Sequence, residues 1–525
     1  MNEARQNPPR PLRRWIVVGV LAVAALIAIV MVATTWMIPR IPATLPPSQT
    51  PALGAATDAT GATTSIDGRE PMRAIEVDTR LSSGGDIGIS VDPRAEQQRV
   101  DGFGAAMTHS SANLLARMPN DARTDLLEEL FDPDGSVRLS TLRLPIGASD
   151  FVDTDAFTFD DLPDGETDWE LDRFNIDPDR RAMIPVLQEV LAINPAMRLI
   201  ASPWSPPAWL KTGGSLEGGR LLDEDRAYQT YAQYLVRFIE EYREAGLDID
   251  YLTVQNEPQL RHPDGYPGTD MPVWQEARLI ETLGPALDSA GLDTVILGFD
   301  HNWELNPADA ATTPEGEDPA YQYAADLLHT PAAEWIDGVA FHCYSGNAEA
   351  QSRLWEQFRD IEIWVTECSG SRAPGDSREK AFADTLAWQA ANLLIDSLRN
   401  RAAGVLTWNL VLDEHSGPHR GGCETCSGVV TLASDGTITR NAEYYLLAHA
   451  ARYVPPGSVR IASTSSDAEL RHVAFLTPDR SSVLIVWNPS GIPRPLTVGD
   501  DNWTGSVALP ATSLSTISWD APPAS

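Results

Sequence analysis

The chain has 525 residues, and 43% of them are hydrophobic, so it can bury a large core and is not expected to be disordered. Its net charge of −35 argues against nucleic acid as a partner, because an acidic surface repels phosphate backbones. Only four cysteines occur, which excludes a small disulfide-stabilised scaffold and leaves packing as the main source of stability.

The N-terminal part divides into three segments. Residues 1–14 are basic, and residues 15–38 form an uncharged apolar stretch long enough to cross a bilayer as a helix. Because arginines precede this stretch, we expect a cytoplasmic tail, a transmembrane signal-anchor helix over 15–38, and the remaining chain outside the cytoplasm. A long cleaved signal followed by secretion is the alternative. Residues 39–72 are rich in Pro, Ala and Thr without apolar periodicity, which predicts a linker.

From residue 98 the chain alternates short apolar runs with helical stretches. The stretch 226–246, for example, has apolar residues at i, i+3 and i+4 spacing. The predicted strands are 100–107, 140–149, 198–205, 250–257, 294–302, 338–345, 362–369 and 404–412. Strands that alternate with helices pair in parallel, and eight such units predict an α/β fold, namely a (β/α)8 TIM barrel over residues 98–453.

The segments on either side of this barrel have a different pattern of apolar and polar residues. Residues 73–97 and 454–521 alternate apolar and polar residues in short runs separated by turns, which is typical of antiparallel sheet. We therefore expect both ends of the chain to pair into one all-β sandwich domain.

Side chains capable of chemistry stand where the predicted strands end. In a barrel of this kind the active site lies at that end of the strands. The run TVQNEPQ places Asn256 and Glu257 after an apolar strand and before Pro258. The candidate residues on this rim are Arg143, Trp204, Asn256, Glu257, His342, Tyr344, Glu367 and Trp408.

Two carboxylates among them, Glu257 and Glu367, end the fourth and seventh strands, which face each other across a barrel mouth. Carboxyl groups about 5–5.5 Å apart hydrolyse a glycoside by double displacement with retention, whereas a separation of about 6.5–9.5 Å leaves room for water and inverts the anomeric centre. The sequence does not fix this distance. A single Glu at a strand end is more often a structural ion-pair partner, but two of them near an amide and rim tryptophans favour catalysis.

Individual roles follow from the chemistry. The amide of Asn256 can hold the sugar hydroxyl next to the anomeric carbon, which makes the adjacent Glu257 the acid/base and Glu367 the nucleophile. Arg143 can keep Glu367 ionised. His342 fits either a substrate contact or a supporting role. Such a reaction needs neither a metal nor another cofactor.

The chain resembles the glucosylceramidase family, glycoside hydrolase family 30. The motifs that carry this resemblance are QRVDGFGAAMT, LRLPIGASDF, LIASPWSPPAWLKTGG, LTVQNEPQ, FHCYSG, WVTECSG and LTWNLVLD, within a likeness that spans about residues 74–520. The resemblance implies a retaining mechanism without a metal, with Glu257 as acid/base and Glu367 as nucleophile. It also implies that the sugar site is lined by Arg143, Trp204, Asn256, Tyr344 and Trp408.

One position departs from the family pattern. His109 follows GFGAAMT, where the human-type lysosomal members carry an aspartate, so we treat His109 as a substrate-binding candidate and leave the identity of the sugar open. We expect a retaining β-glycoside hydrolase that acts on β-glucosides of a carbohydrate or glycolipid. β-1,6-Glucanase and β-xylosidase activity are the alternatives within the family, and a catalytically inactive carbohydrate-binding protein is the alternative outside it.

The cysteines allow two interpretations. In HSGPHRGGCETC, Cys423 and Cys426 follow two histidines at a spacing that could coordinate zinc, but a Cys423–Cys426 disulfide is favoured outside the cytoplasm. Cys343 and Cys368 lie on neighbouring predicted strands, and we expect buried thiols there.

Overall fold

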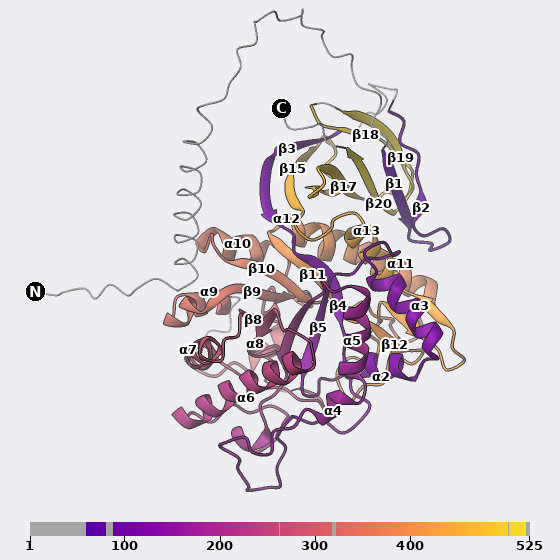
Figure 1. Ribbon diagram of the computed structural model, residues 1–525. Coiled ribbons are helices and arrows are strands. Elements are labelled where there is room, and N and C mark those ends of the chain that lie inside the picture. The colour runs from indigo at the N-terminus through magenta and orange to yellow at the C-terminus, as the bar shows by residue number, and fades with distance from the viewer. Residues whose placement is uncertain (1–58, 80–87, 262, 318–321, 502, 521–525) are drawn as a thin grey trace, which may run out of the picture. The chain divides into compact units, whose positions relative to one another are not determined.

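A computed structural model describes residues 59–79, 88–261, 263–317, 322–501 and 503–520, which belong to one unit of the chain (Figure 1). The described residues do not include the segments that we expected to form the cytoplasmic tail, the transmembrane helix over 15–38 and most of the linker. Within the described ranges, no helix combines the length and the apolar character that a membrane crossing requires.

Eight parallel strands close into a barrel, which confirms the predicted fold class. They are β4 (Gly102–Ala106), β5 (Thr141–Ile146), β6 (Arg198–Pro203), β7 (Tyr251–Thr253), β8 (Val295–Asn302), β9 (Ile336–His342), β10 (Glu362–Glu367) and β11 (Ala402–Asn409). Each strand pairs with the next one along the chain, and β11 pairs with β4 to close the ring. Nearly all of their residues are buried, as expected for strands covered on both faces.

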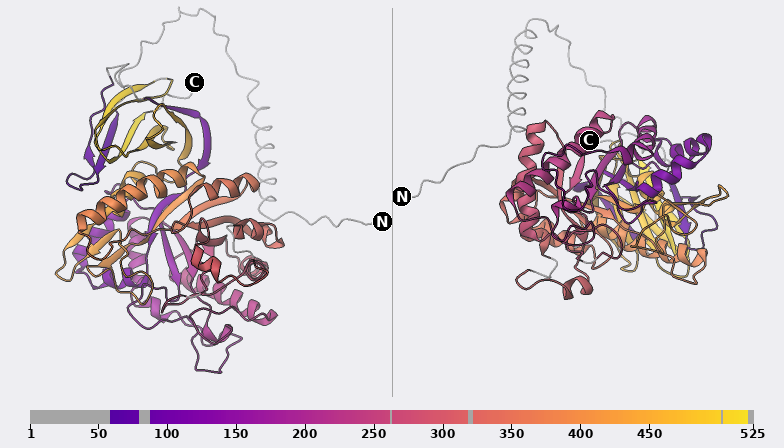
Figure 2. Two further views of the ribbon diagram at one scale, coloured as in Figure 1. Left: turned by 180° about the vertical axis from the view of Figure 1, so that it is seen from behind. Right: turned by 90° about the horizontal axis from the view of Figure 1, so that it is seen from below.

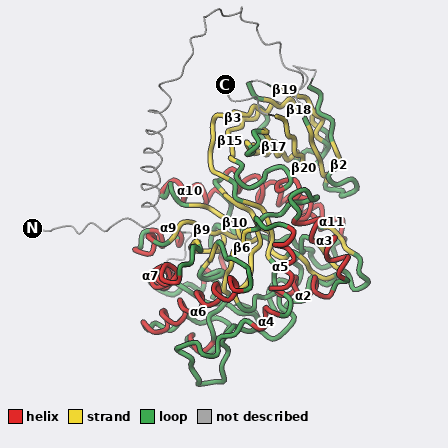
Figure 3. Tube along the Cα trace, viewed as in Figure 1, coloured by secondary structure: helices red, strands yellow, loops and turns green. Residues whose placement is uncertain are grey.

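Helices surround the strands of the barrel (Figure 3). The helices are α2 (His109–Arg117), α3 (Asn120–Phe131), α4 (Asp177–Arg180), α5 (Met183–Ile193), η1 (Ala208–Leu210), α6 (Asp225–Glu244), α7 (Val273–Ala290), α8 (Pro307–Ala311), α9 (Tyr323–Leu328), η2 (Pro331–Glu334), α10 (Glu349–Gln357), α11 (Arg378–Trp388), the π-helical η3 (Gln389–Asp396), α12 (Ser397–Arg399) and α13 (Ala442–Ala451). Helix α6 shows why they form, because its buried side chains Tyr231, Leu235 and Phe238 recur at the spacing of one helix face.

A small sheet follows the last barrel strand. Strands β12 (Val411–Asp413) and β13 (Val430–Leu432) pair in parallel, and β14 (Ile438–Arg440) pairs antiparallel with β13. This sheet connects β11 to helix α13.

Both ends of the described chain contribute to a third sheet, which has nine strands. Its strands are β1 (Thr60–Ser65), β2 (Arg73–Ala74), β3 (Gly88–Arg99), β15 (Val459–Ser465), β16 (Arg471–Leu476), β17 (Ser481–Asn488), β18 (Arg494–Gly499), β19 (Thr504–Leu509) and β20 (Ser513–Asp520). The order is β19-β18-β3-β15-β16-β17-β20-β1-β2, so β3 lies between β18 and β15, and the indigo β1 lies beside the yellow β20 (Figures 1 and 2). The sheet folds around a core of its own, which includes Trp503 and Trp519.

The prediction of a linker over 39–72 was wrong for residues 60–65. These residues form β1, which pairs along its whole length with β20, from Thr60 opposite Ser518 to Ser65 opposite Ser513. Threonine favours strands, and the pairing covers an edge of β20 that would otherwise be open. The Thr-rich composition of residues 60–65 therefore encodes a strand.

The nine-stranded sheet also packs on the helices of the barrel. Along β17, Val483, Ile485 and Trp487 belong to the core shared with the barrel, whereas Leu484 and Val486 belong to the core of the sheet. Because successive strand residues point to opposite faces, one strand serves both cores.

Candidate active site

The predicted rim residues come from six strands or the segments that directly follow them. Arg143 lies within β5, Trp408 within β11, and His342 and Glu367 are the last residues of β9 and β10. Tyr344 follows β9 by two residues. Trp204 directly follows β6, and Asn256 and Glu257 follow β7. The fold thus brings the residues to the carboxyl end of the barrel.

Glu257 lies beyond the strand that we expected it to end. Strand β7 stops at Thr253, and the backbone of Glu257 adopts φ +48°, in the left-handed region that a residue with a side chain rarely occupies. Its N–H donates to the carbonyl of Asp300 at 3.0 Å. Pro258 then prevents a continued strand. Backbone strain of this kind is typical of functional sites, where the surrounding structure holds it in place.

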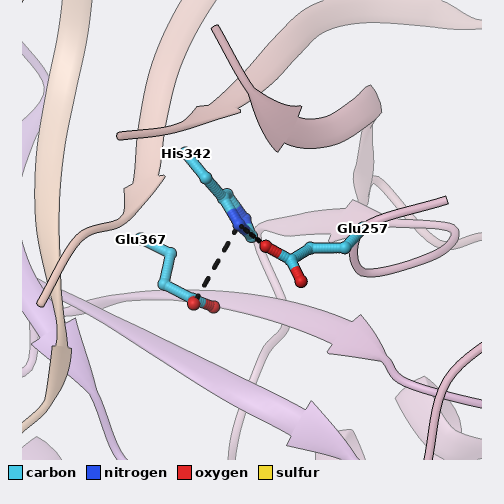
Figure 4. Close-up of side chains that lie close together, drawn as sticks. All are labelled: Glu257, His342 and Glu367. Carbon is cyan, nitrogen blue, oxygen red and sulfur yellow. Dashed lines mark hydrogen bonds and ion pairs between the residues drawn. The ribbon is translucent and has the colours of Figure 1, made fainter. Parts of the chain in front are cut away.

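The two carboxylates and His342 form one cluster. One oxygen of Glu257, one oxygen of Glu367 and a nitrogen of His342 all lie within 4.8 Å of one another. His342 Nδ1 is 3.0 Å from Glu257 Oε1 and 4.0 Å from Glu367 Oε1, so the imidazole lies between them (Figure 4). The side chain of Glu257 is 15% exposed and that of Glu367 8% exposed, so both are shielded from most solvent.

Two donors hold the carboxylate of Glu367. Arg143 Nη1 donates to Oε2 at 2.6 Å, and the phenol of Tyr344 donates to Oε1 at 2.9 Å. Both oxygens are therefore fixed in position, which suits a group that must attack along one direction.

Asp300 connects Arg143 and His342 through its carboxylate. Its carboxylate accepts hydrogen bonds from Arg143 Nη2 at 2.8 Å and from the Thr253 hydroxyl at 2.7 Å, and it also contacts His342 Nε2 at 3.0 Å. Burial opposes ionisation, but the charges of Arg143 and His342 outweigh it and hold the pKa of Asp300 well below its usual range. The buried anion thus positions both the arginine and the histidine.

Asn256 is oriented by the same arginine. Arg143 Nη2 donates to Asn256 Oδ1 at 2.7 Å, which fixes the amide and leaves its Nδ2 hydrogens without a partner among the described residues. An amide held in this way offers a donor to a ligand hydroxyl.

The charges of the cluster are coupled. Burial raises the pKa of Glu367, and the nearby Glu257 adds to this, against His342 and Arg143. Burial acts on Glu257 as well, but the hydrogen bond from His342 and the surrounding cations lower the pKa of Glu257. His342 is itself buried, yet its three carboxylate neighbours raise its pKa to about 9.

The cluster also has the spacing of metal ligands, but its chemistry does not suit a cation. A metal would need a neutral His342 with a free lone pair. His342 instead bridges carboxylates with both nitrogens, and the guanidinium of Arg143 already neutralises Glu367.

Trp204 and Trp408 form the apolar wall of the site. Their rings stack at a centroid distance of 5.2 Å with planes 26° apart, and the guanidinium of Arg143 lies 5.0 and 5.4 Å from the two centroids. Only 3% of each residue is exposed, so most of the surface of both rings is covered by protein contacts.

Comparison with known proteins assigns this architecture to a family. The family model for the glycosyl hydrolase family 30 TIM-barrel domain matches residues 100–454, and that for the glycosyl hydrolase family 30 beta sandwich domain matches residues 457–517. The chain belongs to glycosyl hydrolase family 30.

Individual relatives of this family 30 protein agree. An endo-1,6-β-D-glucanase of Aspergillus fumigatus is 31% identical over 82% of this chain and 86% of its own length. A lysosomal acid glucosylceramidase of Mus musculus is 30% identical over 82% of this chain and 83% of its own. A solved endo-β1,6-glucanase structure superposes with a TM-score of 0.79 at 30% identity, covering 89% of this chain and 99% of the other. The protein is a retaining glycoside hydrolase.

One expected site residue of this family 30 enzyme points elsewhere. His109 Nε2 donates to Asp179 Oδ1 at 2.7 Å, and its ring packs edge-on against Phe157. Asp179, on α4, also accepts from Tyr242 of helix α6, so these contacts of His109 lie in the helix layer. The assignment of His109 to substrate binding does not agree with these contacts. The first turn of α2 turns this side chain toward the helices.

Several residues near the carboxylates were not predicted, among them Asp300 and His301, whose Nε2 lies 4.0 Å from Glu257 Oε1. Asp150, in the loop after β5, is 8% exposed, and burial together with the charges of Glu367 and Glu257 raises its pKa well above the usual range. Tyr266, in the loop after β7, has its pKa raised by burial and by the same carboxylates. Asp150 belongs to the motif LRLPIGASDF, but a loop sequence does not indicate which of its side chains points toward the active site.

The cysteines form two disulfides. Cys423 and Cys426 are bonded, with Cα atoms 5.6 Å apart, and Cys426 packs in one cluster with Trp408. Cys343 and Cys368 are also bonded, which corrects the expectation of free thiols. His342 and Glu367 are paired at the ends of β9 and β10, so the residues that directly follow the two strands lie side by side, with their Cα atoms 5.3 Å apart.

Proposed function

We propose that this protein hydrolyses β-glucosidic bonds through Glu367 as the nucleophile and Glu257 as the acid/base. The approach of their oxygens to within 4.8 Å carries the proposal. It matches the short separation of about 5–5.5 Å that double displacement needs and leaves no room for the water of an inverting enzyme.

In the first step, a carboxylate oxygen of Glu367 bonds to the anomeric carbon while the bond from that carbon to the leaving oxygen breaks. The carboxyl proton of Glu257 passes to the leaving oxygen. In the second step, Glu257 takes a proton from water as the water oxygen attacks the anomeric carbon, and the ester bond to Glu367 breaks. Both carboxyls regain their starting state, so no other reactant is required.

The hydrogen-bond donors support this assignment of roles. Glu367 accepts from Arg143 and Tyr344, two donors that also stabilise the carboxylate when it leaves the ester. Glu257 lies nearest to His342, whose Nδ1 is also near Glu367, and His301 Nε2 lies 4.0 Å from the same oxygen of Glu257. For the first step Glu257 must carry the proton and Glu367 must be ionised, and His342 is the group placed between them.

The remaining polar groups suit the hydroxyls of the sugar. Asn256 offers free amide hydrogens next to Glu257, in line with a contact to the hydroxyl beside the anomeric carbon. Asp150 offers a buried carboxyl near both glutamates. A sugar hydroxyl can donate to it when it is ionised and accept from it when it is protonated.

Among β-glucosides, we propose β-1,6-linked glucan as the substrate. The similarity to proteins named endo-1,6-β-D-glucanases, in sequence and in structure, supports this choice. Glucosylceramide is the second candidate, on the strength of the glucosylceramidase relatives.

A substrate panel tests the proposal. Full-length protein in detergent is assayed on β-1,6-glucan, glucosylceramide and aryl β-glucosides and β-xylosides, with Glu367→Gln as the inactive control. We expect release of β-configured products from β-1,6-glucan and loss of that release in the variant. Equal, near-zero turnover by both proteins on every β-glycoside would overturn the proposal and favour a carbohydrate-binding protein.

We also propose that residues 15–38 anchor the protein in a membrane, with the barrel and sandwich outside the cytoplasm. The uncharged apolar stretch behind a basic tail supports this topology. Retention of the full chain in membranes washed with alkaline carbonate is the expected result. Recovery of a shortened chain in the medium would indicate cleavage and secretion.

A further inference from the structure

A cavity of about 330 Å³ lies outside the proposed catalytic cluster. It is bounded by the segments that follow β10 and β11, by helices α11 and α13 and by strands β13 and β14. None of the eight rim residues and neither Asp150 nor Tyr266 lines it. Its size is within the range of small-molecule sites, about 300–1,000 Å³.

The cavity has an amide whose orientation is fixed. Asn441 Nδ2 donates to the carbonyl of Gly428 at 2.9 Å and to the hydroxyl of Thr431 at 2.9 Å. Both amide hydrogens are used, so Asn441 Oδ1 remains as an acceptor, and Thr431 still has its hydroxyl hydrogen to donate. Both residues line the cavity, which therefore offers an acceptor and a donor side by side.

A buried carboxyl lies in the same wall. Glu443 is 1% exposed, and its Oε1 accepts from the N–H of Gly370 at 3.1 Å and from the hydroxyl of Ser427. Its Oε2 has no hydrogen-bond partner among the described residues. Buried polar atoms are nearly always paired, so an atom left over beside a cavity indicates a partner that the chain itself does not supply.

Two aromatic rings form an apolar wall of the cavity. Phe382 on α11 and Tyr445 on α13 both line the cavity, and their rings meet edge to face at a centroid distance of 5.9 Å. Thr385, one turn along α11 from Phe382, also lines it. The cavity thus combines an apolar wall with several hydroxyl, amide and carboxyl groups.

We propose that this cavity is a second carbohydrate site, which binds one uncharged sugar unit of a glucan chain. The cavity is lined by charged residues of both signs, so neither an anion nor a cation is favoured throughout. The acidic residues are Asp67, Glu379, Asp413, Glu414 and Glu443, and the basic ones are Arg372, Arg378 and Arg440. A sugar hydroxyl both donates and accepts, and the C–H face of a pyranose packs on an aromatic ring. The choice of a glucan rests on the proposed function.

The cavity lies close to the wall of the catalytic site. Leu412 and Cys426 line it and also pack in one cluster with Trp408. A chain held there stays attached to the protein while another segment occupies the barrel. Such a site raises the local concentration of a polymeric substrate without taking part in bond cleavage.

Calorimetric titration of full-length Glu367→Gln protein with a β-1,6-linked glucose disaccharide tests the proposal. Two sites are expected, the second with a dissociation constant on the order of 1 mM, as is usual for so small a ligand. Phe382→Ala, which removes an aromatic wall, should weaken the second site about tenfold or more. Thr385→Val, which keeps the shape and removes one hydroxyl, should weaken it roughly fivefold.

Trp388→Ala is the matched control, because Trp388 lies on the same helix, is 43% exposed and does not line the cavity. It should leave both sites intact. A second site that persists unchanged in Phe382→Ala and Thr385→Val, or a titration with one site that these variants do not affect, would overturn the proposal. If Glu367→Gln bound the disaccharide in the cavity but not at the carboxyl end of the barrel, that result would instead contradict the proposed catalytic function.

Crystals of Glu367→Gln soaked in the same disaccharide give an independent readout. Density for a pyranose in contact with Asn441 and Phe382 is the expected result. Density confined to the carboxyl end of the barrel would overturn the second site even if a variant failed to fold.

Discussion

Cys343 directly follows His342, and Cys368 directly follows Glu367, so the disulfide between the two cysteines joins the strands at the level of the proposed catalytic cluster. Strand pairing alone already sets His342 opposite Glu367. The covalent bond beyond them prevents the two strand ends from separating. We infer that the bond positions the nucleophile relative to the histidine.

Replacing both cysteines, as Cys343→Ala with Cys368→Ala, should lower kcat more than it raises KM. The bridge spans 25 residues, so its loss should also cost roughly 2–4 kcal/mol of unfolding free energy. The double variant Cys423→Ala with Cys426→Ala is the control, since that bridge spans only 3 residues and should contribute less to stability. Denaturant unfolding and steady-state kinetics measure both effects. An unchanged kcat in the first variant would show that strand pairing suffices.

The two glutamates should respond differently to the leaving group. Glu257→Gln removes the acid, so it should slow hydrolysis of poor leaving groups by roughly 10²–10⁴-fold and affect activated aryl glucosides much less in the first step. Glu367→Gln removes the attacking oxygen and should abolish turnover of both. Added azide should restore turnover only in Glu257→Gln and yield a glycosyl azide of retained configuration. The opposite pattern would exchange the two roles.

His342 should set the alkaline limit of activity. Its positive charge and its hydrogen bond lower the pKa of Glu257, so His342→Gln should raise that pKa and shift the basic limb of the kcat/KM profile to higher pH. A purely structural histidine would lower activity at every pH without moving the limb. An unmoved basic limb, in a variant that still folds, would contradict this role.

The regular part of the fold was predictable because it depends on local periodicity. All eight barrel strands fall within or beside the predicted ranges, and Glu367 ends β10 as expected. Parallel strands in a barrel place their carboxyl ends together, so the rim residues could be grouped without coordinates. The pairing of β3 with β15, far apart in sequence, followed from the same alternating pattern at both ends.

The rest depends on contacts that a sequence does not encode locally. Glu257 owes its position to a left-handed backbone and a hydrogen bond to Asp300, not to the end of a strand. The disulfide of Cys343 required the register of β9 against β10. His109 was assigned to substrate binding and Asp150 was not predicted, because the direction of a loop or first-turn side chain is set by packing. Strand β1 was missed because its threonines also suit a linker.

Stability should fall on acidification through His449, which links the barrel to the nine-stranded sheet. Its Nδ1 lies 2.9 Å from Thr516 Oγ1 on β20, and its Nε2 lies 3.0 Å from Thr64 Oγ1 on β1. Thr516 donates its own hydrogen to the His449 carbonyl and Thr64 accepts from Met72, which fits a neutral ring that donates through Nδ1 and accepts through Nε2.

Burial lowers the pKa of His449 to about 3, so the folded protein leaves this ring neutral at pH values where the unfolded chain protonates it. The stability is therefore complete above a pH of about 6.5 and is lost progressively as the pH falls toward the folded-state pKa, by roughly 2 kcal/mol at pH 5. His449→Gln should be less stable at pH 7.5 but should lose less stability between pH 7.5 and 5, as measured by denaturant unfolding. The exposed His415→Gln is the control and should follow the wild type. Parallel stability curves for wild type and His449→Gln would show that this histidine does not make the junction acid-sensitive.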